Sequence, residues 1–77
     1  SPPALEASMP PRQSIEASMR LVAQDLHDAG FQIECHIADN VNLSRGQISI
    51  LSRVLREMAA NIIRHGDPKK PASLFIS

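Results

Sequence analysis

The chain has 77 residues, with 8 basic and 8 acidic side chains and a formal net charge of zero. This length allows one small domain at most, and Phe31 and Phe75 are its only aromatic residues. Without an aromatic stacking set or a dense basic patch, nucleic-acid binding is a poor fit. Cys35 is the single cysteine, which excludes an intrachain disulfide and favours a reducing, cytoplasmic compartment. No apolar run approaches the roughly 20 residues of a membrane span, so we expect no membrane contact from this segment.

Residues 1–13 predict a proline-rich linker or tail, because Pro2, Pro3, Pro10 and Pro11 stand among small residues. Ser14 is placed to cap a helix that runs to about residue 29, where Gly30 provides the stop. Spacings of three and four residues define one apolar stripe on this helix, formed by Ile15, Met19, Val22, Leu26 and Ala29.

Residues 31–37 alternate between apolar and polar side chains, a pattern typical of a half-buried strand. Cys35 falls on the apolar side and is interpreted as a small core residue. His36 falls on the polar side and has no partner at a metal-ligand spacing. Residues 39–42 then have the composition of a turn.

A second helix is predicted over residues 45–65. Ser44 and Gln47 have the spacing of a capping box, and Gly66 provides the stop. Residues 67–71 form a loop, and residues 73–77 read as a strand. The order helix, strand, helix, strand predicts an α/β fold, a two-layer sandwich fragment over residues 14–77. Because the sequence stops on an apolar strand, we interpret it as a truncated unit.

The second helix carries two neighbouring stripes whose centres lie about a third of a turn apart. Glu57 and Asn61 stand four residues apart and lie one above the other, and Arg64 and His65 follow one turn later. The apolar stripe consists of Leu51, Leu55, Met58, Ala59 and Ile62. A polar stripe beside a core stripe meets either solvent or a ligand.

Charge is unevenly distributed along the chain. The basic residues of the second half are Arg45, Arg53, Arg56, Arg64, Lys69 and Lys70. Only Glu57 and Asp67 oppose them there. This excess suits a ligand that bears phosphates, although a solvated helix face explains the charges equally well.

The run Glu57-Met-Ala-Ala-Asn61-Ile-Ile-Arg64-His65 resembles the N box of the GHKL, or Bergerat-fold, ATPases. The preceding Leu51-Ser-Arg53-Val-Leu55-Arg56 is similar to the lead-in of sensor histidine kinases. The resemblance covers about residues 14–77 and implies the start of the ATP-binding domain of such a kinase, truncated after the N box. An ordinary surface glutamate, paired with Arg53, is the alternative for Glu57.

The resemblance also implies the roles of the site residues. Glu57 would act on the phosphoacceptor histidine, and Asn61 would hold Mg²⁺ against the triphosphate of ATP. Arg64 and His65 would contact phosphates, although cations in a last helical turn also favour the helix dipole. A complete parent kinase would work with a second kinase protomer and a response regulator.

Leu26-His27-Asp28 has the look of a phosphoacceptor box, but only 29 residues separate His27 from Glu57. The predicted strand and loop fill that interval, so we interpret His27 as a solvent-facing residue. The Asp-x-Gly-x-Gly segment that reads adenine in the family is missing, since Gly30, Gly46 and Gly66 are isolated. We therefore expect that this piece alone neither binds ATP usefully nor transfers phosphate.

Two other interpretations stay open. The chain could be a non-enzymatic interaction or dimerisation module, in which helical stripes and an unpaired strand edge bind another copy. It could also be a degenerate phosphotransferase or an anti-sigma kinase of the same fold. An exposed strand edge predicts a homo-oligomer.

Overall fold

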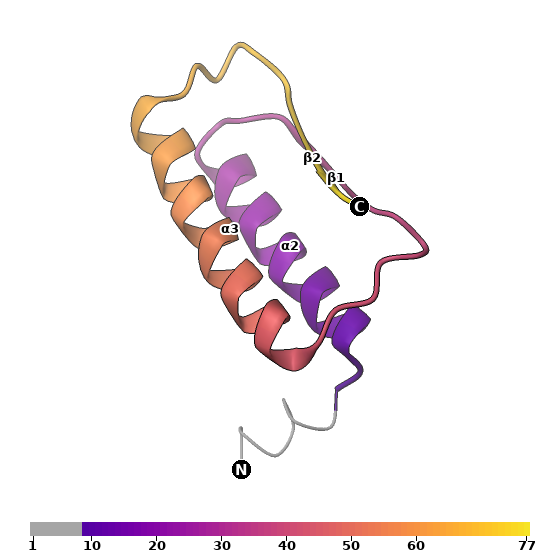
Figure 1. Cartoon of the computed structure of the whole chain (residues 1–77). Helices are drawn as coiled ribbons and strands as arrows, with labels where there is room; N and C mark the ends of the chain where they lie inside the picture. Colours follow the sequence, from indigo (N-terminus) through magenta and orange to yellow (C-terminus); the bar gives the residue numbers. More distant parts are fainter. Residues whose placement is uncertain (1–8) are drawn as a thin grey trace.

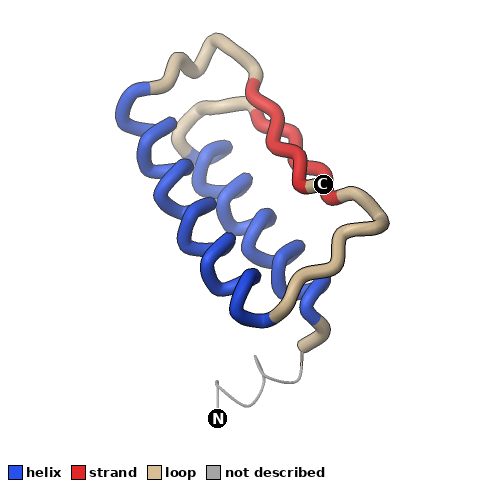
Figure 2. Tube along the Cα trace, viewed as in Figure 1, coloured by secondary structure: helices blue, strands red, loops and turns tan. Residues whose placement is uncertain are grey.

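A computed structural model describes residues 9–77 (Figure 1). It contains helix α2 (Pro11–Asp28), strand β1 (Ile33–Ile37), helix α3 (Arg45–His65) and strand β2 (Ala72–Ile76). The element order confirms the predicted α/β fold. The helices run in the same direction, and the strands run back beside them (Figures 1 and 2). Within the described residues, no helix is long and apolar enough to cross a membrane.

Helix α2 begins three residues before the predicted cap. Pro10 is the N-cap residue and Pro11 is the first helical residue, so no side chain caps this end. Proline is favoured at this position because its missing N–H would have no helical partner and its φ already suits a helix. The prediction that Ser14 caps the helix was therefore wrong, and residues 11–13 are helical rather than part of a linker. Residues 1–8 of the predicted linker lie outside the described residues.

Gly30 ends α2 as predicted, through a Schellman motif. Its φ is +92°, a backbone conformation that residues with a Cβ atom rarely adopt. The Gly30 N–H donates to the His27 carbonyl at 2.9 Å, and the Phe31 N–H donates to the Leu26 carbonyl at 2.9 Å. Leu26 and Phe31 are both buried in the core. The motif therefore satisfies the end of the helix and directs the chain toward β1.

Helix α3 has the predicted bounds and the predicted capping box. The Ser44 hydroxyl accepts from the Gln47 N–H at 3.2 Å, and the Gln47 side chain accepts from the Ser44 N–H at 2.9 Å. At the other end, the Gly66 N–H donates to the Ile62 carbonyl at 2.7 Å. The backbone of Gly66 is extended, so glycine is not needed there for its φ angle. It is needed because the backbone lies close to its neighbours: a Cβ at this position would lie 2.6 Å from the Ile62 oxygen and 3.0 Å from the Phe31 ring.

The two strands form a parallel sheet. Ile33 lies opposite Ala72 and Ile37 lies opposite Ile76. Parallel strands need a crossover, and α3 with its flanking loops provides it. Along β2 the residues alternate between half-buried and exposed, because successive side chains point to opposite faces.

Helix α2 occupies the centre of the packing. It contacts both α3 and β1, whereas β2 is held mainly by β1. Four of its five predicted stripe residues are buried, and Ala29 is exposed because it follows the helix as its C-cap. The buried core consists of Ile15, Met19, Val22, Leu26, Phe31, Ile37, Leu55 and Ala59.

Arg12 ties the first turn of α2 to the exit of β1. Its guanidinium donates to the Ala38 carbonyl at 2.9 Å and to the Ile37 carbonyl at 3.2 Å. Glu16, one turn along, accepts from the Arg12 Nε at 3.0 Å and orients the side chain. Arg12 thus provides hydrogen-bond donors for two backbone carbonyls at the point where the chain leaves the sheet.

The interpretation of Cys35 as a core residue was wrong, because Cys35 is exposed. It lies in the middle of β1, a strand with one free edge, and α2 covers that part of the strand incompletely. A cleft of about 270 Å³ between α2 and β1 opens beside it, lined also by Arg12, Arg20 and His36. Partial burial raises the pKa of the Cys35 thiol, which lowers its nucleophilicity at neutral pH.

Two glycine substitutions test the close approach at the end of α3. We expect Gly66→Ala to destabilise the fold by about 1–3 kcal/mol, because the new methyl group meets backbone at the Ile62 oxygen. Gly46→Ala is the control: its nearest neighbour would be the Ser44 Oγ at 4.0 Å, so helix propensity should stabilise α3 by about 0.5 kcal/mol. Urea denaturation followed by circular dichroism measures both, and equal stability of the two variants would contradict the packing.

Candidate functional site

Packing against α2 sets the rotation of α3 about its own axis. Leu55 and Ala59 point into the core, and the Ser52 hydroxyl lies 2.8 Å from the Ser18 hydroxyl of α2. At about 100° per residue, Asn61 lies half a turn around α3 from Ser52. The polar stripe therefore occupies the side of α3 that faces away from α2.

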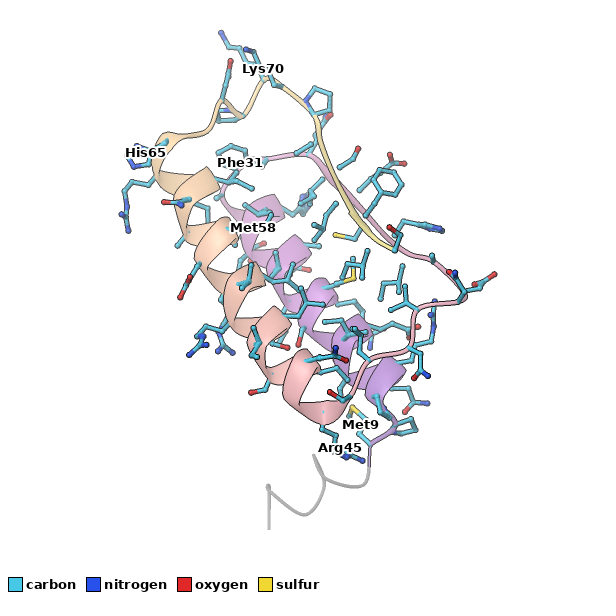
Figure 3. The ribbon with its side chains drawn as sticks, viewed as in Figure 1. Met9, Phe31, Arg45, Met58, His65 and Lys70 are labelled. Atoms are coloured by element: carbon cyan, nitrogen blue, oxygen red, sulfur yellow. The ribbon has the colours of Figure 1, made fainter. Side chains whose placement is uncertain are left out.

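Glu57, Asn61, Arg64 and His65 are all exposed on α3. By helical geometry they fall within an arc of about 100°, with Asn61 one turn after Glu57. Figure 3 shows His65 at the end of the helix, projecting away from the sheet. The structure thus places the predicted site residues on one accessible surface.

No other side chain engages these four residues within residues 9–77. The ion pairs of that part of the chain both involve Arg12, so Glu57 does not pair with Arg53. A solvated carboxylate and amide remain able to turn toward a ligand. Their oxygens are the kind that Mg²⁺ prefers, and this cation usually takes few protein ligands. Residues 9–77 contain no cluster of three or more His, Cys, Asp and Glu side chains that could hold a metal.

An apolar stripe adjoins the polar one and was not predicted. Ile50, Val54 and Met58 follow one another at four-residue spacing and are 56%, 40% and 41% exposed. Met58 was expected in the core, but it is exposed at its margin, where it lines a small gap together with Val22 and Leu26 of α2. The spacing could have revealed this stripe, since the apolar residues of α3 span more than one face.

A groove between α2 and α3 is a second feature that the sequence did not indicate. It has a volume of about 480 Å³. Its polar lining comes from Ser14, Ser18, Ser49, Ser52, Arg45 and Arg56. These residues come from two helices and share no sequence motif, so only their packing brings them together.

Comparison with known protein families, curated proteins and solved structures gives no match for this chain. The candidate site therefore depends on the residues and on their placement on α3.

Asn61→Ala tests whether the amide has a structural role. Asparagine is a poor helix-interior residue, and the side chain is exposed without a hydrogen bond, so we expect a gain of about 0.5 kcal/mol in stability. Asn42→Ala, in the exposed loop before α3, should change stability by less than about 0.5 kcal/mol. Urea denaturation separates the two, and a destabilised Asn61→Ala variant would show that Asn61 supports the fold.

Proposed function

We propose that the chain is the N-terminal part of the ATP-binding domain of a sensor histidine kinase. The observation that carries the proposal is the exposed pair Glu57 and Asn61, one turn apart on α3 and followed by Arg64 and His65. The order helix, strand, helix, strand agrees with the start of such a domain. A complete kinase of this kind works in the cytoplasm and passes the γ-phosphoryl group of ATP to a histidine, then to a response regulator.

Each residue has a defined part in the proposed reaction. The Glu57 carboxylate orients the acceptor imidazole and can accept its proton. The Asn61 amide oxygen would hold Mg²⁺, which would supply charge neutralisation at the phosphates. Arg64 and His65 provide cationic and hydrogen-bonding contacts to phosphate oxygens. Catalysis of this type consists mostly of positioning and charge stabilisation, which a rigid helix supports.

The exposed apolar stripe favours a second function, that of an interaction module. Ile50, Val54 and Met58 present a continuous apolar surface that a partner could cover. A degenerate phosphotransferase or an anti-sigma kinase would use the same α3 surface.

The catalytic proposal is tested in the complete kinase. Asn61→Ala should lower Mg²⁺-dependent autophosphorylation by at least about 100-fold, because the metal loses its protein ligand. Glu57→Gln keeps the shape of the side chain but removes the base, and should lower the rate by about 100-fold. Transfer of label from radioactive ATP measures both, with Asn42→Ala as the control. Unchanged autophosphorylation in Asn61→Ala would refute the metal role.

The chain by itself should bind a fluorescent ATP analogue no better than millimolar, because it contains the proposed phosphate contacts Arg64 and His65 but no Asp-x-Gly-x-Gly segment to bind adenine. The same chain joined to an Asp-x-Gly-x-Gly segment of its own gene should bind at least about 10-fold more tightly. Titration with and without Mg²⁺ measures this difference. Equal, tight binding by the chain alone would contradict the proposed division of the site.

A further inference from the structure

The groove between α2 and α3 lies on the far side of α3 from the candidate site. Its volume of about 480 Å³ falls in the range of small-molecule sites, roughly 300–1,000 Å³. The polar α3 residues that line it recur at spacings of four, three and four, so they share an arc of about 60°. They are Arg45, Ser49, Ser52 and Arg56. Because Asn61 lies about half a turn around α3 from Ser52, a ligand in this groove is separate from one at the candidate site.

The charge of the groove is of one sign. Both of its charged residues are arginines, and none of the described residues that line it is acidic. Arg56 is exposed and forms no ion pair within residues 9–77. The whole chain balances 8 basic against 8 acidic side chains, so the overall charge does not cause this local excess. A concave surface with charge of one sign concentrates ligands of the opposite sign, and the groove therefore favours an anion.

Arg45 stands where the helix disfavours its charge. It is the first residue of α3, next to the positive end of the helix dipole. Neither α2 nor α3 has an acidic residue in its first turn, and both helices begin at the same end of the molecule (Figure 1). Figure 3 shows Arg45 at this end, beside Met9. The two helix ends thus add to the positive potential of the arginines, and a local rule broken in this way is typical of a functional site.

Serine hydroxyls supply further hydrogen-bond donors. The Ser18 and Ser52 oxygens lie 2.8 Å apart, so one hydroxyl donates to the other and the hydrogen of the second stays available. The hydroxyls of Ser14 and Ser49 form no hydrogen bond within residues 9–77. The groove therefore combines two cationic groups with several neutral donors, which suits an anion with many oxygen atoms.

The spacing of the arginines sets the length of the ligand. Arg56 follows Arg45 by 11 residues, which is about 16 Å along the helix axis. A single molecule that contacts both arginines therefore needs an anionic group at each end. Between these ends the lining is partly apolar, and Leu21 is 69% exposed there. A hydrocarbon body would cover Leu21 and remove its side chain from water.

Phosphate fits each end better than carboxylate. Each arginine has a serine one turn away on α3: Ser49 follows Arg45, and Ser52 precedes Arg56. A guanidinium fork already occupies both oxygens of a carboxylate. A terminal phosphate has three acceptor oxygens, so it can bind the fork and the neighbouring hydroxyl together.

We propose that the groove binds a small organic molecule with a phosphate group at each end of an apolar body. Arg45 and Arg56 bind one phosphate each, assisted by Ser49 and Ser52, and Leu21 covers the body. The inference does not rest on the proposed kinase function, because it requires neither Mg²⁺ nor the polar stripe of α3.

The probe is the terminal bisphosphate of hexanediol, titrated into the full chain at physiological salt and followed by calorimetry. We expect it to bind at least about 10-fold more tightly than hexyl phosphate, which leaves one arginine without an anion. Octanedioate, a dicarboxylate of similar length, should also bind at least about 10-fold more weakly than the bisphosphate. Amide chemical shifts locate the ligand: Ser18 and Ser52 should shift, and Asn61 should not.

Variants of exposed arginines test the assignment of the two ends. Arg45→Ala and Arg56→Ala should each weaken binding of the bisphosphate at least about 10-fold. Arg53→Ala is the matched control, because Arg53 is an exposed arginine of the same helix outside the groove lining. It should bind like the unchanged chain, and so should Arg64→Ala, which alters the candidate site. Circular dichroism confirms that each variant keeps its helices.

Four results would overturn the proposal. The first is no binding of the bisphosphate at millimolar concentration, and the second is equal binding of hexyl phosphate or octanedioate. The third is equal weakening by Arg53→Ala and Arg56→Ala, which would show attraction to surface charge alone. The fourth is loss of binding in Arg64→Ala but not in Arg56→Ala, which would place the ligand at the candidate site.

Discussion

The buried stripe of α2 holds the structure together. Ile15 and Leu26 are 1% and 0% exposed, and α2 is the element that contacts both α3 and the sheet. Each fully buried aliphatic side chain of this kind contributes about 1.5–3 kcal/mol. Because α3 and the strands contact one another little, α3 depends on α2 for its place, and so does β1. A core without buried aromatic rings apart from Phe31 leaves little reserve in so short a chain.

This packing also decides which residues reach solvent. Ser18 and Ser52 are small, so the two helices approach closely, and their hydroxyls hydrogen-bond to each other. Ala59 is a small buried residue at the same interface. Because that side of α3 packs against α2, Glu57 and Asn61 are exposed and form no ion pair or side-chain hydrogen bond within residues 9–77. The exposure of the candidate site thus follows from the rotation of α3, whose opposite side packs against α2.

Elements governed by local rules could be predicted from the sequence, and features that depend on neighbours could not. The Ser44–Gln47 capping box and the Gly30 stop are local, so the bounds of α3 and the end of α2 were correct. The start of α2 was missed because Pro10 and Pro11 favour a linker and a helix start alike.

Cys35 and Met58 were placed in the core by periodicity, but their burial depends on how far α2 covers the sheet and α3. Periodicity also leaves strand direction open, and the observed parallel pairing requires a crossover connection, which α3 provides. The polar stripe was predicted with its residues, while the apolar stripe beside it was not.

Arg12 gives the fold a mechanical property. Its guanidinium fastens the first turn of α2 to the carbonyls of Ile37 and Ala38, directly before the loop that leads to Ser44 and α3. Because of these contacts, α2 cannot slide along β1 without first breaking two hydrogen bonds from a charged side chain.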